Sequence, residues 1–343
     1  MASRISNVTG EEVQILIMKL ERAKGFLISD LPLVDLSDST RLETSQNQSP
    51  PKHLRQTDSI CGHLKHLGVI PSEGTCCCFI ELGCGTAKLS DHLSESLGGD
   101  CCHVLIDKVD ASQFKAERLR DGRIRNRQQP KRYFARVAAD LQDRTLLDRV
   151  IDNARMEKSN TKFIAVSKHL CGSAADFAIQ GIEYYCCRNR NHPSPPPLAV
   201  ATCCHHRCDE DSFSNMSFFN FLGFSKRDFE VLRTVSQWSS IKIERVDTDD
   251  QENMGSSTGA VQYTSLPVLP PQPLPTNLGE VPLIPSEKFE REYSRQEKAA
   301  LGKRCKLSLD TARGHALKRI GYTDIRFVRY TILSLEDTLI IAM

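Results

Sequence analysis

The stretch Phe79-Ile80-Glu81-Leu82-Gly83-Cys84-Gly85-Thr86-Ala87-Lys88-Leu89 decides the fold of this 343-residue chain. The apolar run 77–82 predicts a buried strand, the glycines predict a sharp turn, and leucines at 89, 93 and 97 predict a helix. A strand, a glycine-rich turn and a helix form the first unit of a nucleotide-binding α/β sheet. A plain strand-to-helix turn would leave the same local pattern, so the neighbouring residues have to decide between the two interpretations.

Acidic residues accompany three successive predicted strands. Glu81 lies just before the turn, Asp107 ends the apolar run 102–106, and Asp140 follows the run 133–137. A carboxylate beside the turn disfavours a diphosphate and suits a cationic ligand such as S-adenosylmethionine (SAM). At the spacing of Asp107 such a sheet places an acid on ribose hydroxyls, and Asp140 could meet the adenine amino group. Each acid alone could be a helix N-cap or a loop residue. Together they predict a SAM site made of Glu81, Gly83, Gly85, Asp107 and Asp140.

Strand and helix patterns alternate after this first unit. Buried strands are expected at 163–167 and 198–202, with helices at 141–155 and 173–187. Two further strands close to the C-terminus are near enough to pair as a hairpin, at 325–330 and 338–342. The predicted fold class is therefore α/β, with a mostly parallel sheet and a C-terminal antiparallel hairpin, the layout of Rossmann-like class I SAM-dependent methyltransferases.

The ends of the chain differ in composition from this alternating core. Residues 1–55 contain an amphipathic helix at 11–25 and a polar linker, and residues 56–343 are expected to form the methyltransferase domain. Within that domain, 247–286 is polar and then rich in proline, which predicts a flexible insertion. A helical pattern follows it at 287–320.

Composition bounds the possible partners and the compartment. A net charge of +2 makes no global case for nucleic acid, yet 108–136 holds ten Lys/Arg against three acids. That excess fits a phosphate-binding face or a solvated helix and loop. The chain has 14 cysteines, no signal peptide and no apolar run near 18 residues. We therefore expect free thiols in an intracellular protein of the cytoplasm or nucleus, with no membrane contact and an oligomeric state that the sequence leaves open.

Polar clusters follow the fourth and fifth predicted strands, where ligands bind in open α/β sheets. The first is Lys168-His169 and the second is Cys203-Cys204-His205-His206-Arg207-Cys208. The second cluster also suggests zinc, but ligands crammed into six residues cannot all reach one tetrahedral ion. We predict an active-site loop and no metal, and a loop of packed thiols is the alternative. A nucleophilic cysteine is a weaker alternative, since the sequence identifies no partner for a thiolate.

With these motifs in hand, the chain resembles the eukaryotic tRNA 2′-O-ribose methyltransferases that modify nucleotide 4 of the acceptor stem, the tRNA:m4X modification enzymes. The resemblance runs from about residue 56 to residue 343, and KHLCG with CCHHRC makes it specific. Its blocks are 79–90, 106–108, 167–172, 203–208, 235–240, 302–307 and 334–337. It implies SAM as methyl donor and tRNA as partner. The chain departs from the family in having Ala87 for a third glycine and no cysteine before Cys61 for upstream zinc modules.

The ribose hydroxyl must lose a proton as it attacks the methyl group, so a base or a nearby cation is needed. Lys168 and His169 are the first choices for this role, and His205 and His206 come second. Candidate contacts to the RNA backbone are Arg207, Arg118, Arg120, Arg123, Arg125 and Arg127. The alternatives are an RNA-binding protein that has lost turnover and a methyltransferase with a non-RNA substrate. The loop typical of amino-nitrogen methyltransferases is absent after the fourth strand, which favours an oxygen target.

Overall fold

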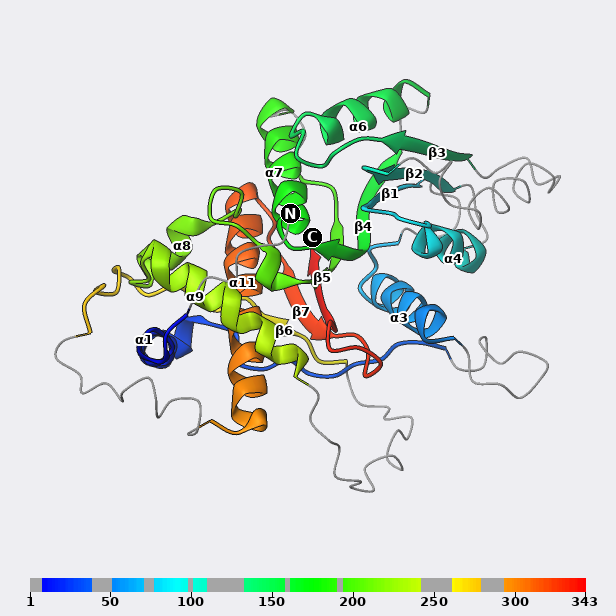
Figure 1. Ribbon diagram of the computed structural model, residues 1–343. Coiled ribbons are helices and arrows are strands. Elements are labelled where there is room, and N and C mark those ends of the chain that lie inside the picture. The colour runs from blue at the N-terminus through cyan, green and yellow to red at the C-terminus, as the bar shows by residue number, and fades with distance from the viewer. Residues whose placement is uncertain are drawn as a thin grey trace.

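A single mixed sheet forms the centre of the protein (Figure 1). The computed structural model describes residues 8–38, 51–70, 77–97, 101–109, 133–157, 161–189, 194–241, 261–278 and 293–343. Eight strands pair in the order β3-β2-β1-β4-β5-β8-β7-β6. The first five run parallel, and the last three pair antiparallel. The order of the five parallel strands is that of a doubly wound nucleotide-binding sheet, which reverses direction between β1 and β4.

The strands confirm the predicted alternation. The five parallel strands are β1 (Cys77–Leu82), β2 (Cys101–Asp107), β3 (Tyr133–Ala138), β4 (Lys162–Cys171) and β5 (Leu198–Cys203). The predicted C-terminal hairpin is present as β7 (Ile325–Arg329) and β8 (Thr338–Ala342). Strand β8 joins β5, so the hairpin closes one side of the parallel sheet. Apolar strands buried on both faces explain why the sequence pattern was readable.

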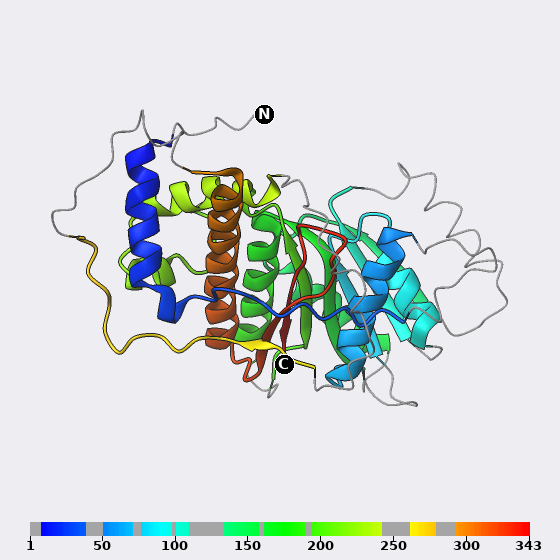
Figure 2. The same ribbon diagram turned by 90° about the horizontal axis from the view of Figure 1, so that it is seen from below.

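Helices cover both faces of the sheet, as Figure 2 shows. Side chains of α3 and α4 pack on one face, and those of α6, α7 and α11 pack on the other. A further layer of α1, α8 and α9 packs on the far side of α11. The helices are α1 (Gly10–Arg22), α3 (Lys52–His66), α4 (Lys88–Leu97), α6 (Leu146–Glu157), α7 (Ser173–Arg188), α8 (Met216–Phe221), α9 (Lys226–Ser236) and α11 (Arg295–Ile320). Short 3₁₀ turns are η1 (Lys24–Phe26), η3 (His205–Arg207) and η4 (Gln237–Ser240).

Helix α11 runs through the interior of the protein. Ser294 and Glu297 form a capping box at its start, and Gly321 ends it with φ 117°. Its middle is buried on all sides because α7 and the sheet lie on one side and α9 on the other. This explains why the helix carries buried polar residues such as Asp310 and Arg313 in place of a simple apolar stripe.

Two segments differ from the sequence prediction. Strand β4 extends to Cys171, so Lys168 and His169 lie within the strand and not in a loop after it. Pairing with β5 holds this extension, with an irregularity between Ser167 and Leu170. Residues 261–278, assigned to the flexible insertion, include strand β6 (Thr264–Ser265), which pairs with β7. The remainder of 247–286 lies outside the described residues.

The N-terminal segment packs onto the main body. Leu16 and Leu20 of α1 are buried in the layer that contains α9 and α11. After η1, Ile28 and Leu31 enter the core beside the sheet, and Leu33 bridges to Arg329 of β7. Across the described residues, no helix combines the length and the apolar character needed to cross a membrane.

Candidate active site

The glycine turn after β1 has an unusual backbone. Gly83 and Gly85 have φ of 63° and 49°, and Ala87 has φ of 50°. Glycine adopts this left-handed region without strain, whereas Ala87 pays about 1 kcal/mol or more for it. A Cβ placed on Gly85 would meet nothing within 4 Å, so this side of the turn is open to a ligand. The predicted turn is therefore present, and Gly85 offers its backbone for close approach.

Two of the predicted acids, Asp107 and Glu81, stabilise the turn through hydrogen bonds to backbone N–H groups. The Asp107 carboxylate, at the end of β2, accepts from the Gly85 N–H at 2.7 Å and from the Val109 N–H at 2.9 Å. The Glu81 carboxylate is buried and accepts from the Ser90 N–H at 3.0 Å, at the start of α4. A carboxylate has about four acceptor positions, so Asp107 can still accept hydroxyl donors from a ligand. Glu81 lies deeper and acts on the shape of the turn.

Asp140 pairs with a lysine, and Arg136 contacts the turn, in ways that the sequence did not indicate. Asp140 forms an exposed ion pair with Lys108 at 2.8 Å, and the hydrogen bond from Lys108 holds the pKa of Asp140 below its usual value. The Arg136 guanidinium donates to the Gly85 carbonyl at 3.1 Å and to Cys84 Sγ at 3.0 Å. Sequence analysis counted Arg136 only as one of a run of basic residues. Its place on β3, two strands from the turn, could not be seen from spacing alone.

The three motifs meet at one edge of the sheet. A Cβ on Gly83 would lie 3.1 Å from the side chain of Leu170 in β4. Gly172, with φ of 56°, lies so close to Arg207 that a Cβ would come within 2.7 Å of the arginine Cβ and 2.9 Å of its carbonyl oxygen. The glycine turn, KHLCG and CCHHRC therefore pack against one another at the carboxyl ends of β1, β4 and β5.

The Lys168 ammonium is partly buried and has other cations near it. Its Nζ donates to the His53 carbonyl at 3.1 Å and lies 3.3 Å from His53 Nδ1. Burial, with the charge of Lys88 next, lowers the pKa of Lys168 to about 8. The charge of Lys168 and burial in turn lower the pKa of His53. His53, on α3, is a site residue that sequence analysis missed, because 115 residues separate it from Lys168.

The three predicted histidines occupy different environments. His169 is exposed, and desolvation with the charge of Lys168 lowers its pKa. His206 is half-buried, and desolvation and the charge of Arg207 lower its pKa. His205 is buried, with its side chain 0% exposed, and its Nε2 lies 2.9 Å from Asp310. His205, a second choice for the proton-transfer role, therefore does not reach the surface of the site, since its side chain points into the interior toward α11.

His205 belongs to a buried polar network. The Arg313 guanidinium pairs with Asp310 at 3.0 Å and with Asp176 at 2.8 Å. It also donates to the Gly172 carbonyl at 3.3 Å. Burial raises the pKa of Asp310, but the charges of His205 and Arg313 outweigh it and leave that pKa lowered. This network fixes the loops after β4 and β5 against α11, and these loops carry residues of the candidate site.

The cysteines of CCHHRC do not gather around one point. Cys208 is buried and accepts from Arg313 at 2.9 Å, whereas Cys203 and Cys204 face Cys171 at the end of β4. Among the described residues the only group of three or more potential metal ligands is Cys171, Cys203 and Cys204. Cys171, Cys203, Cys204 and Cys208 are all in the thiol form.

The candidate RNA-binding arginines divide into two groups. Arg207 is exposed beside Gly172 at the site. The exposed cations Lys52 and Lys88 also lie near Lys168, and sequence analysis did not select them. The other candidates lie outside the described residues, namely Arg118, Arg120, Arg123, Arg125 and Arg127.

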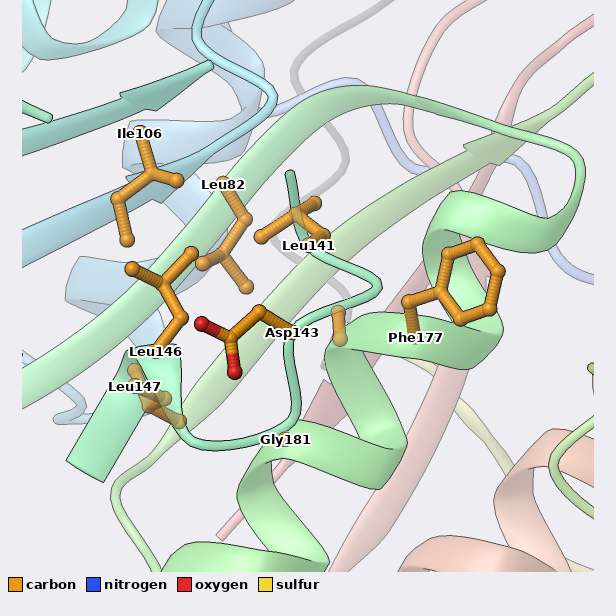
Figure 3. A pocket seen from close by; sticks show the side chains of 9 residues that line it. Leu82, Ile106, Leu141, Asp143, Leu146, Leu147, Phe177 and Gly181 are labelled. Carbon is orange, nitrogen blue, oxygen red and sulfur yellow. The ribbon is translucent and has the colours of Figure 1, made fainter. Parts of the chain in front are cut away.

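A cavity lies beneath the strand ends, between the sheet and helices α6 and α7 (Figure 3). Its volume is about 10 Å³, which is room for about one water molecule. Its lining is apolar except for Asp143 and includes Leu82, Ile106, Leu141, Leu146, Leu147, Phe177, Ala178 and Gly181. The cavity is far too small for a nucleoside.

Comparisons with known proteins match the part of the chain that holds the glycine turn, KHLCG and CCHHRC. Residues 55–270 match the family model described as methyltransferase TRM13. A human protein named tRNA:m(4)X modification enzyme TRM13 homolog is 26% identical, in an alignment that covers 99% of this chain and 75% of that protein. A Dictyostelium discoideum protein of the same name is 26% identical over 69% of this chain and 43% of that protein. The Schizosaccharomyces pombe enzyme is 29% identical over 62% of this chain and 53% of that protein. The chain thus spans about half the length of the last two.

Proposed function

We propose, from the premise that the chain belongs to the TRM13 methyltransferase family, that it methylates a ribose 2′-hydroxyl of tRNA at position 4 of the acceptor stem, with SAM as donor. The observation that carries the proposal is the meeting of the glycine turn, KHLCG and CCHHRC at one edge of the sheet. We also propose that the sheet is a class I methyltransferase fold, because its five parallel strands have the nucleotide-binding order and an antiparallel hairpin closes it.

The residues around the turn fit SAM in shape and charge. Gly85 leaves open space where any other residue would place a Cβ, and Asp107 stands beside it with acceptor positions for ribose hydroxyls. Glu81 and Asp107 add negative charge on the side where a sulfonium and an ammonium would lie. These features support Gly83, Gly85 and Asp107 as donor contacts, and Glu81 as the residue that shapes the turn.

Asp140 is a weaker candidate for the adenine amino group. Its carboxylate is exposed and already paired with Lys108 at 2.8 Å. An exposed pair of this kind contributes little because solvent screens it, so a ligand could displace Lys108 at small cost. We keep Asp140 in the proposed donor site on that ground.

SAM supplies a methyl group that is already activated for attack by an oxygen nucleophile. The protein then has to align the ribose hydroxyl and remove its proton. We propose that Lys168 removes the proton of the ribose hydroxyl, because its lowered pKa makes the neutral amine available near neutral pH. His53 holds the Lys168 Nζ through its carbonyl, and exposed His169 follows in β4, where it can contact the substrate.

The same edge of the sheet carries positive charge for an RNA backbone. Lys52, Lys88 and Arg207 are exposed around Lys168 and Gly172. Double-stranded RNA is recognised largely through phosphates, 2′-hydroxyls and shape, so such a rim suits an acceptor stem. His206, which lies beside Arg207, is a candidate for substrate contact and not for proton transfer, and buried His205 supports the loop that carries them.

The proposal is tested by incubating the purified protein with methyl-labelled SAM and total tRNA, and then mapping the labelled nucleotide. We expect label on the 2′-oxygen of nucleotide 4. Lys168→Met and His169→Ala should each reduce turnover at least about tenfold, with SAM affinity close to that of the wild type. Label on a base or on protein would contradict the proposed substrate, and unchanged turnover in both variants would contradict the assigned roles.

A further inference from the structure

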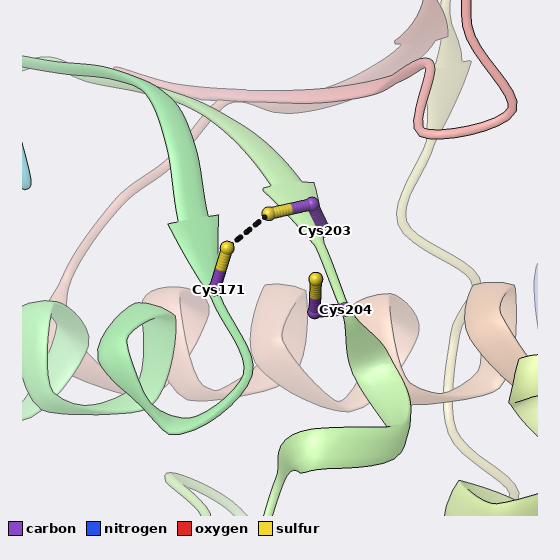
Figure 4. Close-up of side chains that lie close together, drawn as sticks. All are labelled: Cys171, Cys203 and Cys204. Carbon is purple, nitrogen blue, oxygen red and sulfur yellow. Dashed lines mark hydrogen bonds between the residues drawn. The ribbon is translucent and has the colours of Figure 1, made fainter.

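Three thiols gather at the carboxyl ends of β4 and β5 (Figure 4). Cys171 ends β4, Cys203 ends β5, and Cys204 follows directly with a left-handed backbone, φ 50° and ψ 43°. All three sulfurs lie within 4.8 Å of one another. Cys171 and Cys203 are register partners on neighbouring strands, and their sulfurs are 3.0 Å apart. Neighbouring strands lie about 4.8 Å apart, a separation that a disulfide can span.

The three thiols differ in access and in protonation. Cys171 is exposed, Cys203 is buried, and Cys204 lies between these extremes. Hydrogen bonds from Cys203 and Cys204, together with the charge of Arg207, lower the pKa of Cys171. The hydrogen bond to Cys171, together with burial, raises the pKa of Cys203. The exposed sulfur therefore ionises more readily than its buried neighbour, and the two lie 3.0 Å apart, which is the arrangement of an attacking and a resolving thiol.

The sulfur separation favours covalent pairing over metal binding. Tetrahedral zinc that binds sulfur at about 2.3 Å keeps its sulfurs about 3.8 Å apart. The 3.0 Å between Cys171 and Cys203 is well below that separation. The group also offers only three ligands, and no fourth His, Cys, Asp or Glu joins it among the described residues.

A second thiol pair provides an internal comparison. Cys77 and Cys101 are also register partners, and their sulfurs are 3.1 Å apart. They begin β1 and β2, at the opposite edge of the sheet, and both are buried. The two pairs match in spacing and differ in exposure, so a difference in reactivity reports the surroundings of Cys171.

We propose that Cys171 is a peroxide-reactive site whose oxidation closes a disulfide with Cys203. The Cys171 thiolate attacks one oxygen of hydrogen peroxide, an S–O bond forms, the O–O bond breaks, and the departing hydroxide takes a proton as water. Cys203 sulfur then attacks the sulfenic sulfur, the S–S bond forms and the S–O bond breaks, and the departing hydroxide takes the Cys203 thiol proton and leaves as a second water. Two thiols and one peroxide thus give one disulfide and two waters. This modification does not depend on the proposed methyl transfer.

The test treats the reduced, folded full chain with increasing hydrogen peroxide, blocks the remaining thiols by alkylation and maps the peptides by mass spectrometry. We expect the Cys171–Cys203 link to form at least about tenfold faster than a Cys77–Cys101 link. In Cys203→Ser, a sulfenic acid should persist at Cys171, where dimedone traps it, or Cys204 should take over as partner. Arg207→Gln should slow the reaction, because it removes a cation from beside the thiolate.

Wild-type protein alone keeps the test decisive if a variant fails to fold, because the Cys77–Cys101 pair is its control. Equal rates for the two pairs would overturn the proposal. So would one equivalent of zinc that stays with the purified protein and is released when Cys171 is alkylated, since the group would then be a metal site. The test measures disulfide formation and not methyl transfer. Its outcome therefore does not depend on whether the proposed function is correct.

Discussion

At the scale of residues, the surroundings of Lys168 set the pH range in which it can accept a proton. Its ammonium is partly buried, and the charges of Lys88 and Lys52 disfavour the protonated form, whereas Glu81 favours it. None of these neighbours is close to Lys168 in sequence. KHLCG alone therefore indicated the residue, and only the fold explains why its amine can be neutral.

The pH dependence of methyl transfer follows from that lowered pKa. The neutral amine is the active form of a base, so the single-turnover rate should rise with pH and level off above a midpoint near 8. Lys88→Met removes a neighbouring cation, raises the pKa of Lys168 and should move the midpoint to higher pH. Rates measured from about pH 6 to pH 9.5 check both expectations. A rate that falls through the same range would show that Lys168 acts as a cation.

The buried network around Arg313 supports a second prediction, on stability. Arg313→Met leaves Asp176 and Asp310 buried without their cation, which should lower the free energy of unfolding by about 3–5 kcal/mol. Denaturant unfolding measures the loss. Arg149→Met, which breaks the exposed pair with Asp143, is the control and should leave the free energy of unfolding nearly unchanged. Similar losses in the two variants would mean that the network contributes little.

At the scale of elements, the fold shows why two sequence blocks of the resemblance accompany the catalytic motifs. Gly302 of α11 lies against η4, which holds Trp238 and Ser239. The blocks at 235–240 and 302–307 therefore form a helix contact remote from the glycine turn. Sequence analysis identified them only as blocks of the resemblance, and the structure gives the contact between them a packing role.

Substitution of Gly302 tests this contact. A Cβ at Gly302 would lie 2.1 Å from the Ser239 backbone nitrogen, so Gly302→Ala should destabilise the protein by about 1–3 kcal/mol despite its better helix propensity. Gly181 in α7 is the matched control, because the nearest atoms to its Cβ lie at 3.9 Å. Gly181→Ala should be neutral or stabilising by up to about 1 kcal/mol. Thermal unfolding of both variants decides the matter, and equal shifts would refute the close packing.

The strands that sequence analysis found are stabilised by apolar burial, whereas those that it missed are stabilised by pairing with a neighbouring strand. Strands β1, β2 and β5 are apolar runs buried on both faces, so their composition reveals them. The end of β4 is polar, and β6 lies in a proline-rich stretch. Both exist because a neighbouring strand supplies the hydrogen-bond partners, and that neighbour is distant in sequence.

At the scale of the whole molecule, the mostly parallel sheet with its C-terminal hairpin was predictable, and the composition of the site was only partly so. Alternating strands and helices imply the parallel sheet, and its carboxyl edge then collects KHLCG and CCHHRC. Burial of His205 depends on α11, which returns to the sheet 105 residues later. His53 and Arg136 enter the site in the same way, through packing that no local pattern encodes.

Affinity for tRNA should depend on salt as a property of the whole charged edge. Lys52→Gln and Arg207→Gln should each lower the slope of log affinity against log salt by about one, because each removes a phosphate contact. Arg188→Gln is the control, since Arg188 ends α7 at the opposite edge of the sheet and its side chain is 65% exposed. Binding titrations over a range of salt measure the slopes. A flat salt profile for the wild type would exclude this surface.

The central claim is that the open side of the glycine turn binds SAM, and calorimetric titration of the purified protein with SAM tests it most directly. We predict one donor per chain, with affinity at least about tenfold weaker in Asp107→Asn, which keeps an acceptor for the Gly85 N–H but loses the charge. Lys168→Met should bind SAM like the wild type. No measurable heat at millimolar SAM, or equal affinity in wild type and Asp107→Asn, would contradict the claim.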